Sequence, residues 1–367
     1  MATAADLFDP VDPHARGGRP ARVLIVDDSA VARAVMERVL ATTDRYVVIA
    51  SVTTAGAALD VLARERVDYV LLDIQMPGTD GLSALPDLIA AGQGARVLIV
   101  SGQASEGAAA TVQALALGAT DTLFKPTGGG LGPFGNALID KLDRLGEPVA
   151  AQHRAALPVP LPAPFPPDLR PADAGDAYDV VAIGASTGGI HALSRLLRAI
   201  PLDFTLPILV TQHLPTAFMP YFAAQLAVIG GRPCEVASDR LRLRPGRIVV
   251  APGDAHMRCV ALADGSTAIR LTREPVASGC MPSVDPMFAS MASVYGPRML
   301  AVVLSGMGRD GALGAQQVRS AGGCVLVQDQ ASSVIWGMPG AVAQNGGADA
   351  ILTPDAIGRL AAARRRP

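Results

Sequence analysis

A serine in a short glycine-rich segment is the first residue whose setting could do chemistry. The apolar run VVAI ends at Gly184, and Ser186 follows within GASTGG before a helical pattern begins. This segment matches G-x-S-x-G, a sharp strand-to-helix turn that lifts a serine hydroxyl off the sheet edge. It lacks the second glycine of a dinucleotide fingerprint and the lysine of a P-loop. The spacing therefore predicts a nucleophilic serine, with helix capping as the alternative.

A nucleophilic serine needs a base and a carboxylate that orients the base. His213 ends the apolar run PILVTQ, so a parallel sheet would bring its ring to the same edge as Ser186. Asp310 follows the run MLAVVL through a glycine-rich exit and is the predicted partner of His213, with capping of the next helix as the alternative. His256 remains the alternative base, and His191 is expected to be a surface or packing residue.

Charged side chains also follow the apolar runs of the first half. Asp27 and Asp28 follow RVLIV, Asp73 follows YVLL, Lys125 follows TLF, and Ser101 ends a fourth run. We expect these side chains to converge, because parallel strands end at one edge of a sheet. Carboxylates are hard oxygen ligands that suit Mg²⁺. The ammonium and hydroxyl could hold the oxygens of a phosphoryl group carried by an aspartate. For Asp28, a helix N-cap is the alternative.

The elements that would position these residues follow one pattern in both halves. Short apolar runs alternate with helix-period segments, which predicts βα units and parallel sheets. The Pro- and Ala-rich segment Gly146–Asp176 has no apolar period and predicts an extended linker. We predict a flexible leader at 1–20, a first domain at 21–143, the linker at 144–177 and a second domain at 178–363.

Composition narrows the function classes. The chain of 367 residues has a formal net charge of −2, which gives no general attraction to nucleic acid or to an anionic membrane. No basic segment followed by an apolar one opens the chain, and no apolar run is long enough to span a bilayer. The four cysteines are far apart, which favours buried, reduced thiols. We therefore expect a cytoplasmic protein that binds no nucleic acid and inserts into no membrane.

The first half resembles the receiver domain of bacterial two-component response regulators, over about Arg22 to Asp143. The motifs VDDSAVAR, LLDIQMPGTDGL, VSG and KP carry the resemblance, which implies a flavodoxin-like fold. It also implies that a histidine kinase is the phosphodonor for Asp73. The Mg²⁺ ligands implied by the resemblance are Asp27, Asp28, Asp73 and the backbone carbonyl of Gln75.

The same resemblance gives roles to residues near the phosphorylation site. Ser101 would be the switch hydroxyl and Lys125 the phosphate contact, with a cis bond between Lys125 and Pro126. The chain departs from the family at Thr122, where receivers usually have an aromatic residue. The departure puts the aromatic rotamer switch in doubt and leaves the phosphorylation chemistry as it is.

The second half, from about Tyr178 to Leu360, resembles the catalytic domain of the chemotaxis protein-glutamate methylesterases, the CheB family. The motifs IGASTGG, TQHLP, MPSVDPMF, LSGMGRDGALG and GMPGAV occur in the family's order. The resemblance implies a doubly wound, mostly parallel α/β domain in which Ser186 is the nucleophile, His213 the base and Asp310 its partner. The implied oxyanion donors are the backbone N–H groups of Thr187 and Met307. Pro282, Ser283 and Asp285 would shape the mouth of the site.

The implied function is phosphorylation-activated hydrolysis of glutamyl methyl esters on a chemoreceptor, with release of methanol. Deamidation of receptor glutamines is the implied second activity, and the second half needs no cofactor. The sequence leaves the oligomeric state open, with a monomer as the expectation. Two alternatives stand beside this interpretation. One is a phosphorylation-controlled binding module without catalysis, and the other is a DNA-binding regulator, which would need a basic recognition helix.

Overall fold

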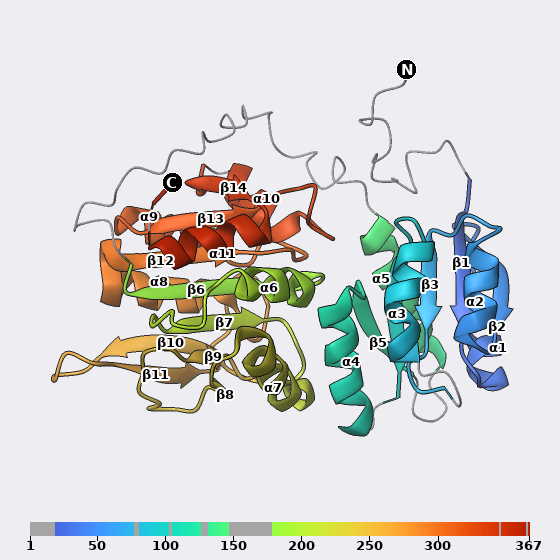
Figure 1. Ribbon diagram of the computed structural model, residues 1–367, viewed down its shortest axis with the longest axis horizontal. Coiled ribbons are helices and arrows are strands. Elements are labelled where there is room, and N and C mark those ends of the chain that lie inside the picture. The colour runs from blue at the N-terminus through green and yellow to red at the C-terminus, as the bar shows by residue number, and fades with distance from the viewer. Residues whose placement is uncertain are drawn as a thin grey trace, which may run out of the picture. The chain divides into compact units, whose positions relative to one another are not determined.

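The chain folds into two compact units, Met1–Arg154 and Ala155–Pro367, each built around its own sheet (Figure 1). The computed structural model describes residues 19–76, 81–102, 105–125, 131–146, 178–344, 346–364 and 366–367. Most of the predicted leader and linker therefore lies outside the described residues. The last helix of the first unit runs to Gly146, past the domain boundary predicted at residue 143.

The first unit is a parallel sheet with the strand order β2-β1-β3-β4-β5. Its strands are β1 (Ala21–Val26), β2 (Tyr46–Val52), β3 (Tyr69–Leu72), β4 (Arg96–Ser101) and β5 (Asp121–Phe124). Its helices are α1 (Ala30–Leu40), α2 (Ala55–Leu62), α3 (Gly81–Ala91), α4 (Ser105–Leu117) and α5 (Leu131–Gly146). Helix α1 packs beside α5, while α2, α3 and α4 follow one another on the other face (Figure 1). This is the predicted flavodoxin-like arrangement.

The second unit contains a larger sheet with the order β14-β13-β12-β6-β7-β9-β8, in which all pairs are parallel. Its strands are β6 (Val180–Ala185), β7 (Ile208–Gln212), β8 (Cys234–Val236), β9 (Ile248–Val250), β12 (Met299–Val303), β13 (Cys324–Gln328) and β14 (Ala350–Leu352). An antiparallel hairpin of β10 (His256–Ala261) and β11 (Thr267–Thr272) stands beside it. The predicted doubly wound, mostly parallel fold is confirmed.

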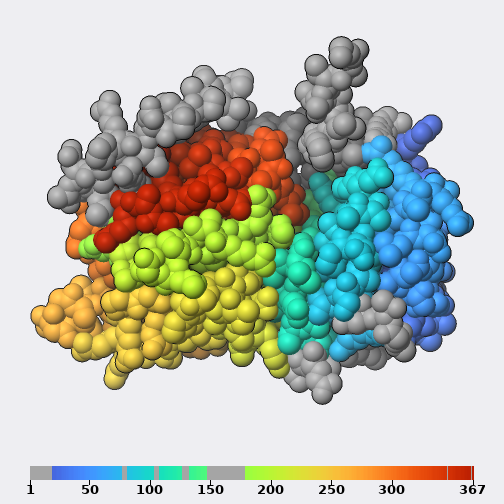
Figure 2. Space-filling view, viewed as in Figure 1, coloured from blue at the N-terminus to red at the C-terminus, as the bar shows by residue number. Residues whose placement is uncertain are grey.

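Helices cover both faces of this sheet. They are α6 (Gly189–Arg198), α7 (Met219–Gly230), α8 (Val284–Tyr295), α9 (Ala312–Ser320), α10 (Gly337–Gln344) and α11 (Pro354–Ala363), with short 3₁₀ turns at Thr216–Phe218 and Gly296–Arg298. Helix α6 packs against α7 and α11, and α9 packs against α8 and α10. In the space-filling view the side chains of α11 (red) lie directly on those of α6 (green) (Figure 2). Such cover explains why the central strands are apolar throughout.

The core of the second unit lies between the sheet and helix α8. Every residue of β6 and β12 is buried, and alternate residues of both strands meet Met287, Phe288 and Met291 of α8. This packing fixes the position of α8 relative to the carboxyl ends of β6 and β12. Within the described residues, no helix combines the length and the apolar character that crossing a bilayer requires.

Candidate active site

Three neighbouring strands bring Ser186, His213 and Asp310 to one edge of the second sheet. β6 lies between β7 and β12, and Ala185 at the end of β6 pairs with Gln212 at the end of β7. Ser186 directly follows Ala185 and His213 directly follows Gln212, so both leave the sheet at the same edge, from neighbouring strands. The chain winds outward from β6 in one direction and later returns through β12 to wind in the other. Parallel α/β sheets bind their ligands at such a switch point.

The turn that carries Ser186 depends on close backbone approaches. A Cβ atom at Gly184 would lie 2.5 Å from Val284, and Gly188 adopts a left-handed φ of +75°. A Cβ atom at Gly306 would lie 2.9 Å from the Cβ of Ser186. The segment that contains Gly306 and Met307 therefore comes right up to the serine, which is half-buried. The backbone of Ser186 is bonded to that of Ser305, because the Ser186 N–H donates to the Ser305 carbonyl oxygen at 3.0 Å.

The imidazole of His213 is bonded to the carboxylate of Asp310, with 2.8 Å between Nε2 and Oδ2. The two residues are 97 positions apart in the chain. The His213 side chain keeps 18% of its surface exposed and the Asp310 side chain 1%. The structure thus places the predicted base and its predicted carboxylate in direct contact, with the histidine open on one side to a substrate.

Asp310 is held by donors from the start of helix α8. The Ser283 hydroxyl donates to Oδ1 at 2.6 Å, and the Val284 N–H donates to Oδ2 at 2.8 Å. Because a helix N-terminus has unpaired N–H groups and a positive dipole end, it stabilises a carboxylate there. In the first turn of α9, the helix that follows Asp310, the Gly314 N–H donates to the carboxylate of Asp285 at 2.7 Å. The N-cap residue of α9 is Gly311, whose N–H donates to Oδ1 of Asp310 at 3.0 Å. Asp310 therefore contacts the amino end of α9 without being its N-cap residue, and its other bonds go to His213 and α8.

These contacts shift three pKa values. Burial alone would raise the pKa of Asp310, but bonds from His213, Ser283 and Val284 outweigh it and lower the pKa to about 2. Burial alone would lower the pKa of His213, but the bonds to Asp310 and Cys280 outweigh it and raise the pKa to about 9. Burial, with Asp310 nearby, raises the pKa of Asp285 to about 6. The pair thus favours an ionised Asp310 beside an imidazolium.

His256, the alternative base, is fully buried and fully engaged in structural bonds. Its Nδ1 accepts from the Ser283 N–H at 3.0 Å, and its Nε2 lies 2.9 Å from the Glu274 carbonyl oxygen. The ring therefore positions Ser283, which in turn binds Asp310. His191 is half-buried in α6.

Cys280 is a member of this site that sequence reasoning missed. Its Sγ atom, a ring nitrogen of His213 and a carboxylate oxygen of Asp310 all lie within 4.8 Å of one another, and the thiol donates to the Ser278 carbonyl oxygen at 3.7 Å. The expectation of buried thiols is confirmed for Cys259 and Cys324 and fails for Cys234 and Cys280, which are half-buried. The sequence held no spacing signal for this contact, since Cys280 lies in the long connection between β11 and α8.

The first sheet gathers its own cluster at the carboxyl ends of β1, β3 and β5. The Lys125 ammonium lies 2.8 Å from Oδ2 of Asp27 and 2.6 Å from Oδ2 of Asp73. Asp27 and Asp73 are buried, whereas Asp28 is exposed. Burial raises the pKa of Asp27, and Lys125 offsets only part of that shift. Burial would lower the pKa of Lys125, but its bonds to both aspartates outweigh it and raise the pKa.

The three carboxylates fit a divalent cation. One oxygen from each of Asp27, Asp28 and Asp73 lies within 4.8 Å of the others, and Lys125 supplies a single positive charge against them. Hard oxygen donors with an uncompensated charge suit Mg²⁺. Gln75 donates its N–H to Oδ1 of Asp73 at 2.9 Å, which orients that carboxylate.

Ser101 lies on β4 and Thr122 on β5, the last two strands of this sheet. Ser101 is buried at the end of β4, and its hydroxyl lies 3.2 Å from that of Thr111. Thr122 lies within β5. The predicted cis bond falls outside the described residues, because Pro126 does.

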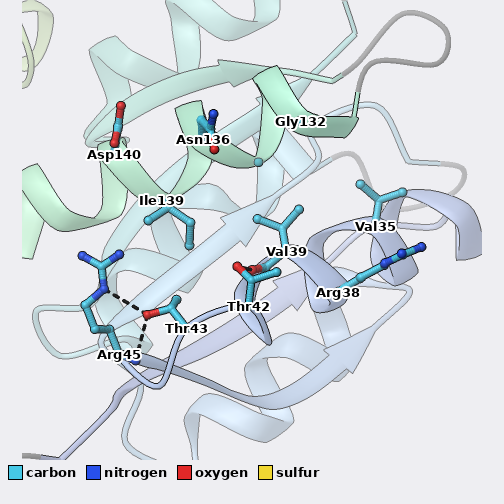
Figure 3. A pocket seen from close by; sticks show the side chains of 11 residues that line it. Val35, Arg38, Val39, Thr42, Thr43, Arg45, Gly132, Asn136, Ile139 and Asp140 are labelled. Carbon is cyan, nitrogen blue, oxygen red and sulfur yellow. Dashed lines mark hydrogen bonds between the residues drawn. The ribbon is translucent and has the colours of Figure 1, made fainter.

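A pocket of about 400 Å³ lies elsewhere in the first unit, between α1 and α5 (Figure 3). Val35, Val39 and Ile139 line it, and at one end Arg45 donates its side-chain and backbone N–H to Thr43. Thr43 and Arg45 precede β2, so this end of the pocket lies at the amino ends of the strands. The acidic cluster lies at the opposite edge, and the pocket is no part of it.

Family models of known proteins match both compact units of the chain. A family model described as CheB methylesterase matches residues 181–360, and one described as response regulator receiver domain matches residues 23–130. A protein-glutamate methylesterase/protein-glutamine glutaminase of Azospirillum brasilense is 40% identical over 94% of this chain and 92% of its own length. One of Caulobacter vibrioides is 42% identical over 94% of this chain and 99% of its own. The solved CheB methylesterase catalytic domain of Thermotoga maritima is 33% identical over 51% of this chain and 98% of its own, with a TM-score of 0.49.

Proposed function

The chain belongs to the CheB family of methylesterases that carry a response-regulator receiver domain, and from this premise we propose which residues perform and control the reaction. The protein is a phosphorylation-regulated protein-glutamate methylesterase and protein-glutamine glutaminase. This membership decides against the DNA-binding and non-catalytic alternatives. The assignment of individual residues rests on the geometry of the site.

Ser186 is the proposed nucleophile and His213 the proposed base. The observation that carries this assignment is the 2.8 Å bond between His213 and Asp310, beside a serine in a nucleophile elbow. Because Nε2 of His213 is bonded to Asp310, the other ring nitrogen is the one that accepts the serine proton. Oγ of Ser186 attacks the ester carbonyl, and the imidazolium then returns the proton to the departing methoxide. Water resolves the acyl-enzyme to the glutamate carboxylate.

Asp310 is the proposed orienting carboxylate. Its bonds from Ser283 and Val284 keep it ionised in a buried position, which stabilises the imidazolium formed during attack. With a carboxamide substrate the same steps would release ammonia in place of methanol. The arrangement therefore serves both the esterase and the glutaminase activity without a cofactor.

The backbone N–H groups of Thr187 and Met307 are the proposed oxyanion donors. Thr187 follows the nucleophile at the amino end of α6, and Met307 follows Gly306, whose close approach to Ser186 is described above. The residue after the nucleophile commonly supplies one such donor. Each donor to a developing oxyanion contributes about 2.7–4 kcal/mol to transition-state stabilisation.

Asp73 is the proposed phosphorylation site of the receiver domain. Asp27, Asp28, Asp73 and the carbonyl of Gln75 would hold Mg²⁺, which when bound neutralises charge on the transferred phosphoryl group. Lys125 already contacts Asp73 and would bind a phosphoryl oxygen. Ser101 is the proposed switch hydroxyl that reports the phosphorylated state to α4.

The proposed partners are a methylated chemoreceptor as substrate and a histidine kinase as phosphodonor. We place the enzyme in the cytoplasm, which is supported by four cysteines that are all free thiols.

The direct test is to incubate the full chain with a methylated chemoreceptor and measure methanol, with and without a small-molecule phosphodonor and Mg²⁺. We expect release that the phosphodonor increases. A folded protein that binds the receptor yet releases no methanol under either condition would overturn the catalytic assignment.

A further inference from the structure

The contact between Cys280 and the proposed catalytic pair creates a set of three different ligand types. A thiol, an imidazole nitrogen and a carboxylate oxygen lie within 4.8 Å of one another. We propose that His213, Cys280 and Asp310 form a binding site for a thiolate-seeking divalent ion, Zn²⁺ above all, and that occupancy inhibits the esterase. This regulatory proposal rests on the proposed roles of His213 and Asp310.

The donor set selects Zn²⁺ over harder cations. Zn²⁺ binds Cys, His and carboxylate ligands in tetrahedral sites, while Mg²⁺ prefers oxygen alone. Zinc–ligand distances of about 2.0–2.3 Å put tetrahedral donors roughly 3.4–3.6 Å apart. The three donors lie within 4.8 Å of one another, and Nε2 of His213 is 2.8 Å from Oδ2 of Asp310. The nitrogen and the carboxylate oxygen need only separate by less than about 1 Å to reach this spacing. A water molecule or a substrate oxygen would complete the coordination.

The three ligands come from separate segments of the same unit. His213 follows β7, Asp310 follows β12, and Cys280 precedes α8. Ser283 and the Val284 N–H already orient the Asp310 carboxylate, as partners outside the metal shell do in metal sites. Cys280 is half-exposed, and 18% of the His213 side chain is exposed. A metal ion can therefore reach both ligands from solvent.

The other thiols do not offer such a site. Burial raises the pKa of Cys234, Cys259 and Cys324 to about 12 in each case. A metal needs the thiolate, so these three are poor ligands. Among the described residues of the second unit, the donors that could hold a metal ion therefore gather around Cys280.

Occupancy would inhibit because the metal would break the hydrogen bond between His213 and Asp310 and change which ring nitrogen carries the proton. The Cys280 thiol loses its proton to solvent as the sulfur–metal bond forms. The metal takes Nε2 of His213 and the Asp310 carboxylate in place of their hydrogen bond. The proton of the neutral ring then stays on Nδ1, so this nitrogen no longer accepts the Ser186 proton. The inhibition is reversible, because a chelator that removes the metal restores the hydrogen bond.

Binding is tested with Co²⁺, whose thiolate complexes absorb in the near ultraviolet. The full chain is titrated in excess Mg²⁺, which saturates the acidic cluster of the first unit. All four cysteines lie in the second unit, so a thiolate band reports only on that unit. We expect the band in the natural protein and in Cys234→Ser, and its loss in Cys280→Ser. Absence of the band, or its persistence in Cys280→Ser, would overturn the site.

Inhibition is tested by titrating Zn²⁺ into the methanol assay, with each variant normalised to its own metal-free rate. We expect reversal by a chelator, and a shift of the inhibitory concentration by about tenfold or more in Cys280→Ser. Cys234→Ser is the matched control and should follow the natural protein. An unshifted Cys280→Ser curve contradicts the proposal. If metal-free protein releases no methanol, the proposed function fails, while the Co²⁺ band still decides the site.

Discussion

The two sheets place aspartates at equivalent edges but surround them in opposite ways. In the first unit, three carboxylates share one ammonium, that of Lys125. In the second, the single carboxylate of Asp310 receives a hydroxyl, backbone N–H groups and an imidazole. Burial raises the pKa of Asp27 and would raise that of Asp310, but donors reverse the shift only in the second case.

This difference would account for the two kinds of chemistry that we propose for the two units. The under-neutralised cluster favours a cation and, with it, transfer of an anionic phosphoryl group. The Asp310 carboxylate, which we call the saturated carboxylate, already accepts bonds from several donors, so it can orient a base without a metal. In both units the order of the parallel strands brings the carboxylates to the carboxyl edge of the sheet. The hydrogen-bond donors around each carboxylate then decide whether it favours a metal ion or orients a base.

The largest expected effect is the loss of esterase activity in Ser186→Ala. Removal of one half-exposed hydroxyl leaves no large cavity, so thermal unfolding should change little. Ser293→Ala, at an exposed serine of α8, is the matched control for activity and stability. More than a few per cent of residual activity in folded Ser186→Ala would refute the nucleophile assignment.

Asp310→Asn tests the saturated carboxylate. We expect turnover to fall by about 10⁴, the scale known for the serine protease triad, because an amide cannot stabilise the imidazolium. Asp285→Asn is the control, since it alters the neighbouring capping carboxylate without touching His213. The two variants are compared by their single-turnover rates. If both rates fall equally, Asp310 contributes by capping a helix and not by orienting His213.

Asp73→Asn tests the under-neutralised cluster. The ratio of methanol release with and without phosphodonor should fall to about one, because an amide cannot form an aspartyl-phosphate. Chelation of Mg²⁺ should have the same effect on the natural protein. Asp44→Asn, at an exposed position of the same unit, serves as the control. Full activation of Asp73→Asn would place the phosphorylation site elsewhere.

The raised pKa of His213 predicts the pH dependence of the reaction. Its pKa of about 9 exceeds the ordinary value of 6.5, so at neutral pH the resting ring is mostly protonated. Because the base must be neutral, kcat/KM should rise with pH through the alkaline range until His213 has lost its proton. Asp310→Asn removes the main partner, so the rise should move to lower pH. A profile already flat above pH 7 would contradict the raised pKa.

Only a small loss of turnover is expected from His256→Ala. This ring acts on the site only through Ser283, so its loss should reduce turnover far less than His213→Ala does. His191→Ala, which changes a histidine on α6, should be close to the natural protein. If His256→Ala proves more damaging than His213→Ala, the base has been assigned to the wrong histidine.

The sequence by itself predicted the two α/β units and the residues that end their strands. Ser186, His213, Asp27 and Asp73 were identified because short apolar runs are a local signal, and parallel strands share one edge. The glycine-rich turn at 184–189 was readable for the same reason, since its close approaches require residues without a Cβ.

Only the tertiary structure decided which side chains touch. The contact of Asp310 with the amino end of α8, the support of Ser283 by His256, and the place of Cys280 beside His213 join segments that no periodicity links. These contacts depend on strand order and on how α8 packs against the sheet. That packing is set by many weak apolar contacts between distant residues, which a local pattern does not encode.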